Sequence, residues 1–210
     1  DGSATYSKTF SIAVNNANDT PTDITLSANA VDENLASGTV VGGLSTTDAD
    51  NGNTFTYTLV GGGSDNDRFS ISGTNLVTAA VLDFETKNSY SIVIQTSDGS
   101  ATYSKTFSIA VNNANDTPTD IALSANAVDE NLASGTVVGG LSTTDADNGN
   151  TFTYTLVGGG SDNDRFSISG TNLVTAAVLD FETKSSYSVV IQTSDGSATY
   201  SKTFSIAVNN

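Results

Sequence analysis

Acidic side chains in this 210-residue sequence recur in short motifs that could bind a hard cation. Ca²⁺ takes 6 to 8 oxygen ligands from carboxylates, amides and backbone carbonyls. The sequence has no histidine and no cysteine, so it lacks the usual general base and any thiolate zinc site. The chemistry that these residue types favour is therefore calcium binding. The carboxylates concerned are Glu33, Asp83, Glu85, Asp116, Asp145, Asp147 and Asp195.

The overall charge points away from nucleic acid. The formal net charge is −16, from 23 acidic and 7 basic side chains, whereas phosphate binding needs clustered Lys and Arg. The sequence has no apolar run of about 18 residues that could cross a membrane, and no signal segment. It begins with Asp1 rather than Met, so we expect an excised piece of a longer chain. An extracellular or cell-surface location is a separate, indirect expectation.

The chain repeats itself. A shift of 97 positions aligns Asp1 with Asp98 and Asp98 with Asp195, and a period of this length suits whole domains in tandem. We expect a repeat over residues 17–113 and a second over 114–210, with residues 1–16 as the last strand of a preceding repeat. The aligned residues of the two repeats differ at three pairs, namely Thr25/Ala122, Asn88/Ser185 and Ile92/Val189.

Alternating apolar and polar residues predict an all-β fold, because Thr, Val, Ile, Phe and Tyr fill the runs and Gly, Asn, Asp and Ser separate them. Seven strands per repeat suit a small Greek-key sandwich. In the first repeat we expect strands near 22–31, 38–46, 54–60, 68–72, 75–81, 89–97 and 103–112. The faces expected in the core are those of Phe55, Tyr57 and Leu59, of Tyr90, Ile92 and Ile94, and of Phe107, Ile109 and Val111.

We expect residues 1–16 to be the loop and last strand of a preceding repeat, without the other strands of that sandwich. A lone strand is unstable in water, so we expect this segment to be mobile or to add to an exposed sheet edge, including that of a neighbouring molecule.

The order of the strands predicts at which end of its sandwich each carboxylate lies. Successive connections of antiparallel strands alternate between the two ends of a sandwich, so Glu33, Asp83 and Glu85 should lie where the first repeat's last strand leaves. The corresponding argument puts Asp145, Asp147 and Asp195 where the second repeat's first strand enters. Both sets, with Asp116, should therefore meet at the linker.

Such a gathering of like charges needs compensation. Two unit charges 4 Å apart repel by about 4 kcal/mol at an effective dielectric near 20. The linker has no Lys or Arg, so either the ends stay apart in solvent or cations neutralise them. Calcium suits the site better than magnesium, which demands a tighter octahedron. Asn113 and Asn115 add neutral oxygens.

A set of motifs resembles the calcium motifs of cadherin repeats, in the same order, and most closely those of large bacterial surface and secreted proteins. The motifs are Val31-Asp32-Glu33-Asn34, Asp48-Ala49-Asp50-Asn51-Gly52-Asn53, Leu82-Asp83-Phe84-Glu85, Ser97-Asp98-Gly99 and Asn113-Ala114-Asn115-Asp116-Thr117-Pro118. The resemblance implies two tandem Ig-like sandwiches with Ca²⁺ at their junction. The implied ligands are Glu33, Asp83, Glu85, Asn113, Asn115, Asp116, Asp145, Asp147 and Asp195.

The period of 97 also places two incomplete, weaker half-sites. Asn18, Asp19, Asp48, Asp50 and Asp98 form one that lacks an upstream partner, and Glu130, Asp180 and Glu182 form one that lacks a downstream partner. Asn150 could add a carbonyl, but its loop spacing differs from the family's.

The acidic residues also allow interpretations other than calcium binding at the junction. The acids could be ordinary solvated turn residues, and Asp65, Asn66 and Asp67 could form a small calcium loop but suit a flexible connection better. Asp83 and Glu85 could imitate a glycosidase pair, yet a module of this size offers no substrate cleft, so we expect no enzyme.

Three functions fit the sequence. The first is a calcium-rigidified spacer in an adhesive or stalk array, held by neighbouring repeats of the same chain. The second is a homophilic adhesin, and the third is a carbohydrate-binding module that recognises a polysaccharide. The absence of Trp disfavours a sugar platform, and the Ser- and Thr-rich surface disfavours tight self-association. A calcium-binding spacer with weak adhesion is the interpretation that remains.

Overall fold

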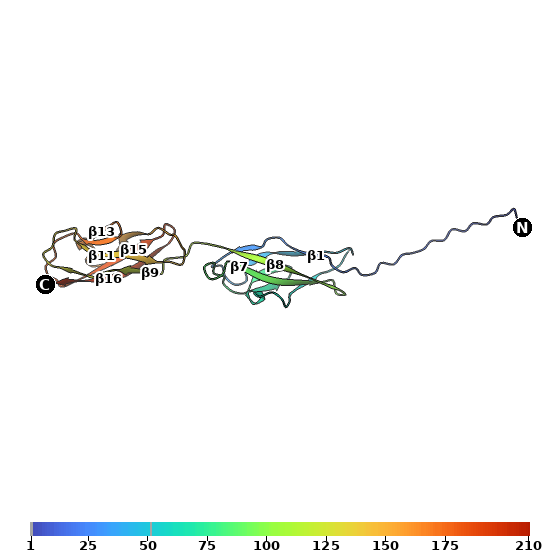
Figure 1. Cartoon of the computed structure of the whole chain (residues 1–210), viewed down its shortest axis with the longest axis horizontal. Helices are drawn as coiled ribbons and strands as arrows, with labels where there is room; N and C mark the ends of the chain where they lie inside the picture. Colours follow the sequence, from blue (N-terminus) through green and yellow to red (C-terminus); the bar gives the residue numbers. More distant parts are fainter. Residues whose placement is uncertain (1, 51) are drawn as a thin grey trace. The chain divides into compact units, whose positions relative to one another are not determined.

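The computed structural model describes residues 2–50 and 52–210, which form two compact units that divide between Asn113 and Ala114. Each unit is a sandwich of two four-stranded sheets (Figure 1). The described residues contain 16 strands and only two short 3₁₀ helices, which establishes the all-β class. Within these residues, no helix is both long and apolar enough to span a bilayer.

The first repeat has two sheets. One has the order β1-β3-β6-β5 and the other β2-β8-β7-β4. The strands are β1 (Asp23–Leu26), β2 (Ala30–Asp32), β3 (Val40–Thr47), β4 (Thr56–Leu59), β5 (Phe69–Ser72), β6 (Asn75–Thr78), β7 (Ser89–Ser97) and β8 (Thr102–Asn112), with the 3₁₀ helix η1 (Asn66–Arg68) between β4 and β5.

The second repeat has the same topology, with sheets β9-β11-β14-β13 and β10-β16-β15-β12. Its elements are β9 (Asp120–Leu123), β10 (Ala127–Asp129), β11 (Val137–Thr144), β12 (Thr153–Leu156), η2 (Asn163–Arg165), β13 (Phe166–Ser169), β14 (Asn172–Thr175), β15 (Ser186–Ser194) and β16 (Thr199–Asn209).

The single strand expected over residues 22–31 is two strands, so each repeat has eight strands among its described residues. β1 pairs antiparallel with β3, whereas β2 crosses to the other sheet and pairs parallel with β8. The crossing brings Ala28 so close to β3 that a Cβ on Gly42 would lie 2.6 Å from the Ala28 carbonyl oxygen. Only glycine fits there, and the strand can therefore change sheets.

The predicted core is confirmed. Ile92, Ile94 and Ile109 are fully buried, and Tyr57, Tyr90 and Val111 are nearly so. Phe55, Leu59 and Phe107 are partly buried and pack against this cluster. Because side chains alternate along a strand, the period-2 pattern was sufficient to select the inward face.

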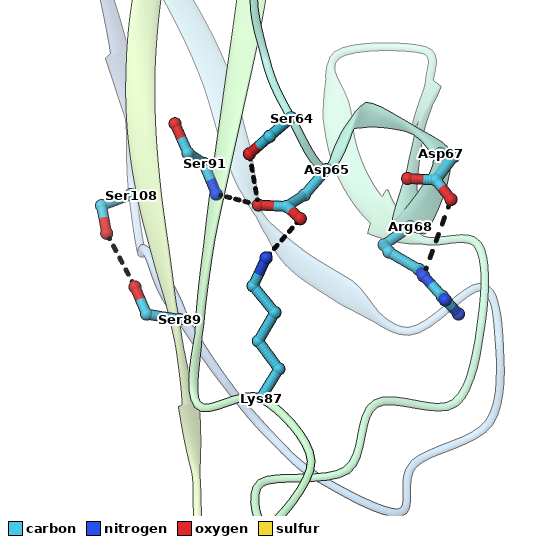
Figure 2. A network of polar contacts seen from close by, with 8 residues as sticks. All are labelled: Ser64, Asp65, Asp67, Arg68, Lys87, Ser89, Ser91 and Ser108. Carbon is cyan, nitrogen blue, oxygen red and sulfur yellow. Dashed lines mark hydrogen bonds and ion pairs between the residues drawn. The ribbon is translucent and has the colours of Figure 1, made fainter.

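The loop between β4 and β5 is tied to the sandwich by side chains, as Figure 2 shows. Asp65 accepts hydrogen bonds from the Lys87 ammonium, the Ser91 amide and the Ser64 hydroxyl. Lys87 also lies 5.0 Å from the centre of the Tyr90 ring. The Asp65 carboxylate is therefore fixed by an ion pair, in a loop that we expected to be a flexible connection.

Residues 2–16 contain no strand and are exposed throughout. Their assignment to a preceding repeat remains a prediction.

The Ile92/Val189 difference between the repeats gives a test of core packing. Both side chains are fully buried. Ile92→Val should lower the free energy of unfolding of the first repeat by about 1 kcal/mol, because it removes one buried methylene. Urea denaturation followed by NMR, which separates the repeats, measures this. Thr25→Ala copies another natural difference at an exposed site and should change stability by less than about 0.5 kcal/mol. Equal effects of both variants would contradict the prediction.

The Asp65 network gives a pH prediction. The Lys87 ammonium, followed by the Ser91 amide, holds the pKa of Asp65 below its ordinary value of 3.8. A lowered pKa stabilises the fold above the unfolded-state pKa, and this contribution is lost as pH falls through the folded-state pKa. Asp65→Asn should thus cost about 1–3 kcal/mol at pH 7 and progressively less below pH 3.8.

Urea denaturation across this pH range measures the difference between Asp65→Asn and the unchanged chain. The matched control is Asp67→Asn, since the Asp67 side chain is 76% exposed beside Arg68 and should contribute less than about 1 kcal/mol. A difference for Asp65→Asn that does not change with pH would refute the ion-pair explanation.

Candidate metal centre

The first repeat brings three predicted ligands together. Glu33 follows β2, while Asp83 and Glu85 lie between β6 and β7, and each offers a carboxylate oxygen within 4.8 Å of the others. The parallel pairing of β2 with β8 explains the position of Glu33, whose amide donates to the Asn112 carbonyl at 3.1 Å. Strand order was therefore a sound basis for placing these three acids at one end.

Each acid of this group is held by hydrogen bonds. Glu33 is 2% exposed, and its Oε2 accepts a hydrogen bond from the Phe84 amide at 2.7 Å. The Thr86 amide and then its hydroxyl lower the pKa of Asp83, at distances of 2.9 and 2.8 Å. The Asn113 amide nitrogen donates to Glu85 Oε1 at 3.0 Å. These bonds orient the oxygens, as a cation site requires.

The second repeat contains the same group at Glu130, Asp180 and Glu182, again with oxygens within 4.8 Å of one another. The Phe181 amide donates to Glu130 Oε2 at 3.1 Å, and the Asn210 side chain donates to Glu182 Oε1 at 3.0 Å. The acids of the predicted upstream half-site are thus held by hydrogen bonds equivalent to those in the first repeat.

The residues predicted as downstream ligands in the second repeat also lie close together within their own unit. The Asp116 amide donates to Asp147 Oδ2 at 2.7 Å, and the Asp147 amide donates to Asp145 Oδ1 at 3.0 Å. The Asn115 side chain donates to Asp195 Oδ2 at 3.0 Å. The linker residues are therefore joined to the two acidic loops that follow β11 and β15.

Asp195 is held in its own turn as well. The amides of Ala198 and Ser197 donate to its Oδ1 at 2.7 and 2.6 Å and lower its pKa.

The first repeat has the equivalent downstream group. The Asp19 amide donates to Asp50 Oδ2 at 2.6 Å, and the Asp50 amide donates to Asp48 Oδ1 at 2.8 Å. The Asn18 side chain donates to Asp98 Oδ2 at 3.1 Å. Hydrogen bonds therefore connect the residues of the predicted half-site, Asn18, Asp19, Asp48, Asp50 and Asp98, and their binding of a cation stays a prediction.

Two buried carboxylate oxygens indicate whether these residues could hold a cation. Asp48 Oδ2 and Asp145 Oδ2 are buried and, among the described residues, have no hydrogen-bond partner. An unpaired buried oxygen of a carboxylate carries a large desolvation penalty, which a cation can offset. Their neighbours are carboxylate and amide oxygens, the donor set that Ca²⁺ prefers. The residues therefore fit calcium.

Sequence reasoning underrated or missed three asparagines. The Asn16 side chain donates to Asp50 and its position was assigned only to a strand end. Asn53 and Asn150 each have a buried side-chain nitrogen without a partner in the described part of the chain. Their recurrence after the acidic loop in both repeats was the available signal.

The unpaired oxygen of Asp145 predicts that one substitution changes the free energy of unfolding in opposite directions with and without calcium. In EDTA, Asp145→Asn should raise the free energy of unfolding by about 1 kcal/mol, because it removes an uncompensated charge while retaining the Oδ1 acceptor. With calcium it should lower that free energy, because a ligand is lost. Urea denaturation in both buffers measures this. Asp164→Asn, at a side chain 74% exposed, is the neutral control. Equal destabilisation in both buffers would contradict the prediction, because it would show that the Asp145 carboxylate stabilises the fold without calcium.

Known proteins resemble this chain over most of its length. It is 27% identical to human Protocadherin Fat 1 over 198 residues and 31% identical to human Protocadherin Fat 4 over 147 residues, which are 88% and 66% of this chain. It spans only 4% and 3% of the lengths of those two relatives.

Solved structures of protocadherin domains are also similar to this chain. The Protocadherin GammaB4 extracellular domain is 27% identical with a TM-score of 0.64, over 94% of this chain and 33% of that one. Human Protocadherin-24 EC1-2 matches in fold alone, at 21% identity with a TM-score of 0.68 over 92% and 99% of the two chains. The family model "Cadherin domain" matches residues 28–112 and 125–209. This chain therefore belongs to the cadherin family and carries two cadherin domains.

Proposed function

We propose that this chain is a calcium-binding extracellular module, in which Ca²⁺ at the inter-repeat junction rigidifies an adhesive or stalk array. The observation that carries the proposal is the buried Oδ2 of Asp48 and of Asp145, each in an acidic loop and without a hydrogen-bond partner among residues 2–50 and 52–210. The cadherin membership supports it, and the solved Protocadherin GammaB4 and Gamma B7 relatives are extracellular domains. We infer the same location for this chain.

The proposed ligands come from three parts of the chain. The upstream repeat supplies Glu33, Asp83 and Glu85, the linker supplies Asn113, Asn115 and Asp116, and the downstream repeat supplies Asp145, Asp147 and Asp195. Calcium supplies positive charge that offsets the repulsion among these carboxylates. The protein's own hydrogen bonds hold the oxygens in place before any ion arrives, which lowers the ordering cost of binding.

The mechanical effect follows from linkage. An ion that binds only the converged arrangement stabilises it by an amount that grows with the logarithm of the calcium concentration over Kd, about 1.4 kcal/mol for each tenfold increase well above Kd. Extracellular calcium modules bind with Kd on the order of 10⁻⁴ to 10⁻³ M. The joint would then stiffen outside the cell and loosen under chelation.

The partners that we propose are neighbouring repeats and, in adhesion, a second cadherin chain. One solved relative, Protocadherin gammaB7 EC3-6, is a cis-dimer. A non-enzymatic role fits a family of adhesion proteins. We keep an origin among bacterial surface proteins as a proposal from the motifs alone, since the two Fat relatives named above are human.

The repeat supplies a matched control for the calcium experiment. Asp116 and Asp19 are equivalent, but only Asp116 lies in a linker with a repeat on each side. Asp116→Ala should weaken the tightest calcium binding by about tenfold, or ~1.4 kcal/mol, whereas Asp19→Ala should leave it unchanged. Calorimetric titration measures both.

Small-angle scattering with and without EDTA measures the mean end-to-end dimension of the chain. Chelation should shorten the mean end-to-end dimension of the unchanged chain, and Asp116→Ala should reduce that response. Negligible binding, equal loss in both variants, or a shape that ignores EDTA would refute the junction site.

A further inference from the structure

The acidic loop after β11 contains a pair of residues that can react with each other. Asn148 is followed by Gly149, and the same pair occurs once more in the sequence, at Asn51-Gly52, where Asn51 lies outside the described residues. Glycine leaves its own backbone nitrogen unusually accessible to the preceding side chain, because it has no Cβ. Asparagine is among the thermolabile residues of proteins. Whether this pair reacts depends on how the fold holds the two groups.

The fold leaves both reacting groups unrestrained. Asn148 and Gly149 are exposed and lie in a turn, where Gly149 has a φ of +90°. A Cβ at Gly149 would meet no atom within 4 Å, so this side of the turn is open. Within the described part of the chain, neither the Asn148 side chain nor the Gly149 amide has a hydrogen-bond partner. The side chain is therefore free to rotate onto the Gly149 nitrogen.

The aspartate-glycine pair of the same repeat is restrained. Gly196 donates its amide to the Ser194 hydroxyl at 3.1 Å. The amides of Ser197 and Ala198 donate to the Asp195 carboxylate at 2.6 and 2.7 Å, so this side chain is not free to rotate. The first repeat holds its corresponding pair in the same way. The structure therefore favours reaction at Asn148 rather than at Asp195.

We propose that Asn148 is a site of spontaneous deamidation to aspartate and isoaspartate. The Gly149 nitrogen loses its proton and attacks Cγ of Asn148. The bond from Cγ to the side-chain nitrogen breaks, that nitrogen takes up a proton and leaves as ammonia, and a cyclic succinimide remains. Water then opens the ring, and the new carboxyl group ionises. Attack at Cγ gives aspartate, whereas attack at the former main-chain carbonyl carbon gives isoaspartate, whose main chain runs through Cβ and Cγ.

The modification changes the acidic loop. Both products add a negative charge, and isoaspartate also lengthens the main chain by a methylene directly after Asp147. The Asp147 amide donates to Asp145, and the Asp147 carboxylate accepts the Asp116 amide. The consequence rests on the proposed function, in which these acids bind calcium. Isoaspartate displaces Asp147 from its neighbours and so weakens calcium binding, whereas aspartate leaves the main chain as it was.

The test uses the full chain with Asn51→Gln, which removes the other asparagine-glycine pair. The protein is incubated in EDTA at neutral and at mildly alkaline pH. Trypsin then cleaves after Lys105 and Arg165 and releases residues 106–165, in which mass spectrometry with electron-transfer fragmentation locates isoaspartate. Conversion should occur at Asn148, with release of ammonia, and should accelerate as pH rises, because the attacking nitrogen must lose its proton.

The same peptide contains an internal control. The Asn163 side chain donates to the Val157 carbonyl at 2.6 Å and accepts from the Val190 amide at 3.1 Å. Asn163 should convert at least about tenfold more slowly, because these hydrogen bonds must break before its side chain can rotate. Asn148→Gln should abolish the conversion at that position, since the longer side chain would have to close a larger ring. Equal rates at Asn148 and Asn163, or no conversion at Asn148, would overturn the modification site.

Calorimetric titration with calcium tests the consequence, again with Asn51→Gln in every sample. The isoaspartate form should bind calcium about tenfold more weakly than Asn148→Gln, as expected when the support of a metal ligand is disturbed. Asn148→Asp should bind at least as tightly as Asn148→Gln. Equal weakening in the isoaspartate form and in Asn148→Asp would overturn the explanation by main-chain lengthening. Absence of calcium binding in every sample would refute the proposed function while leaving the mass-spectrometric result in EDTA intact, so the two failures are distinguishable.

Discussion

The parallel pairing of β2 with β8 is the constraint on which the rest of each repeat depends. The first strand leaves one sheet after Leu26 and joins the other at Ala30, which pairs with Ala110. This crossing connects the two sheets covalently within a few residues and covers the edge of β8. An uncovered edge strand would offer unpaired backbone groups to other chains.

The same pairing positions the acidic group. Because β2 ends beside the end of β8, Glu33 lies against the segment that carries Asp83 and Glu85, and Asn113 follows directly to bond Glu85. A buried carboxylate at this place is costly by itself. The hydrogen bond from the Phe84 amide to Oε2 of Glu33 offsets part of that cost and fixes the orientation of the carboxylate.

The acidic residues of the loops are of two kinds, those paired with a lysine and those with an unpartnered oxygen. In the loop after β4, Lys87 satisfies Asp65 within the protein, and the equivalent pair of Lys184 and Asp162 does so in the second repeat. In the loops after β3 and β11, Asp48 and Asp145 keep a buried oxygen without a partner among the described residues. Acids of the first kind stabilise a repeat directly, and those of the second kind are the candidates for binding a cation.

Sequence by itself was enough for the fold class, the period of 97 and the core faces, because alternation and repetition are local properties of a chain. It also sorted the acids by end, since antiparallel connections alternate, and the groups at Glu33, Asp83 and Glu85 and at Glu130, Asp180 and Glu182 follow that rule. Whether the two sides of the junction share calcium stays a prediction.

Only tertiary structure decided the rest. Division of the first strand depends on how closely Ala28 approaches Gly42, which is a contact between distant positions. The unpaired oxygens of Asp48 and Asp145, the Lys87 bond to Asp65 and the buried amides of Asn53 and Asn150 likewise depend on which groups the folded loops bring together. Side-chain satisfaction is a three-dimensional property, so residue type and spacing could nominate these positions but could not distinguish a salt bridge from a place for a cation.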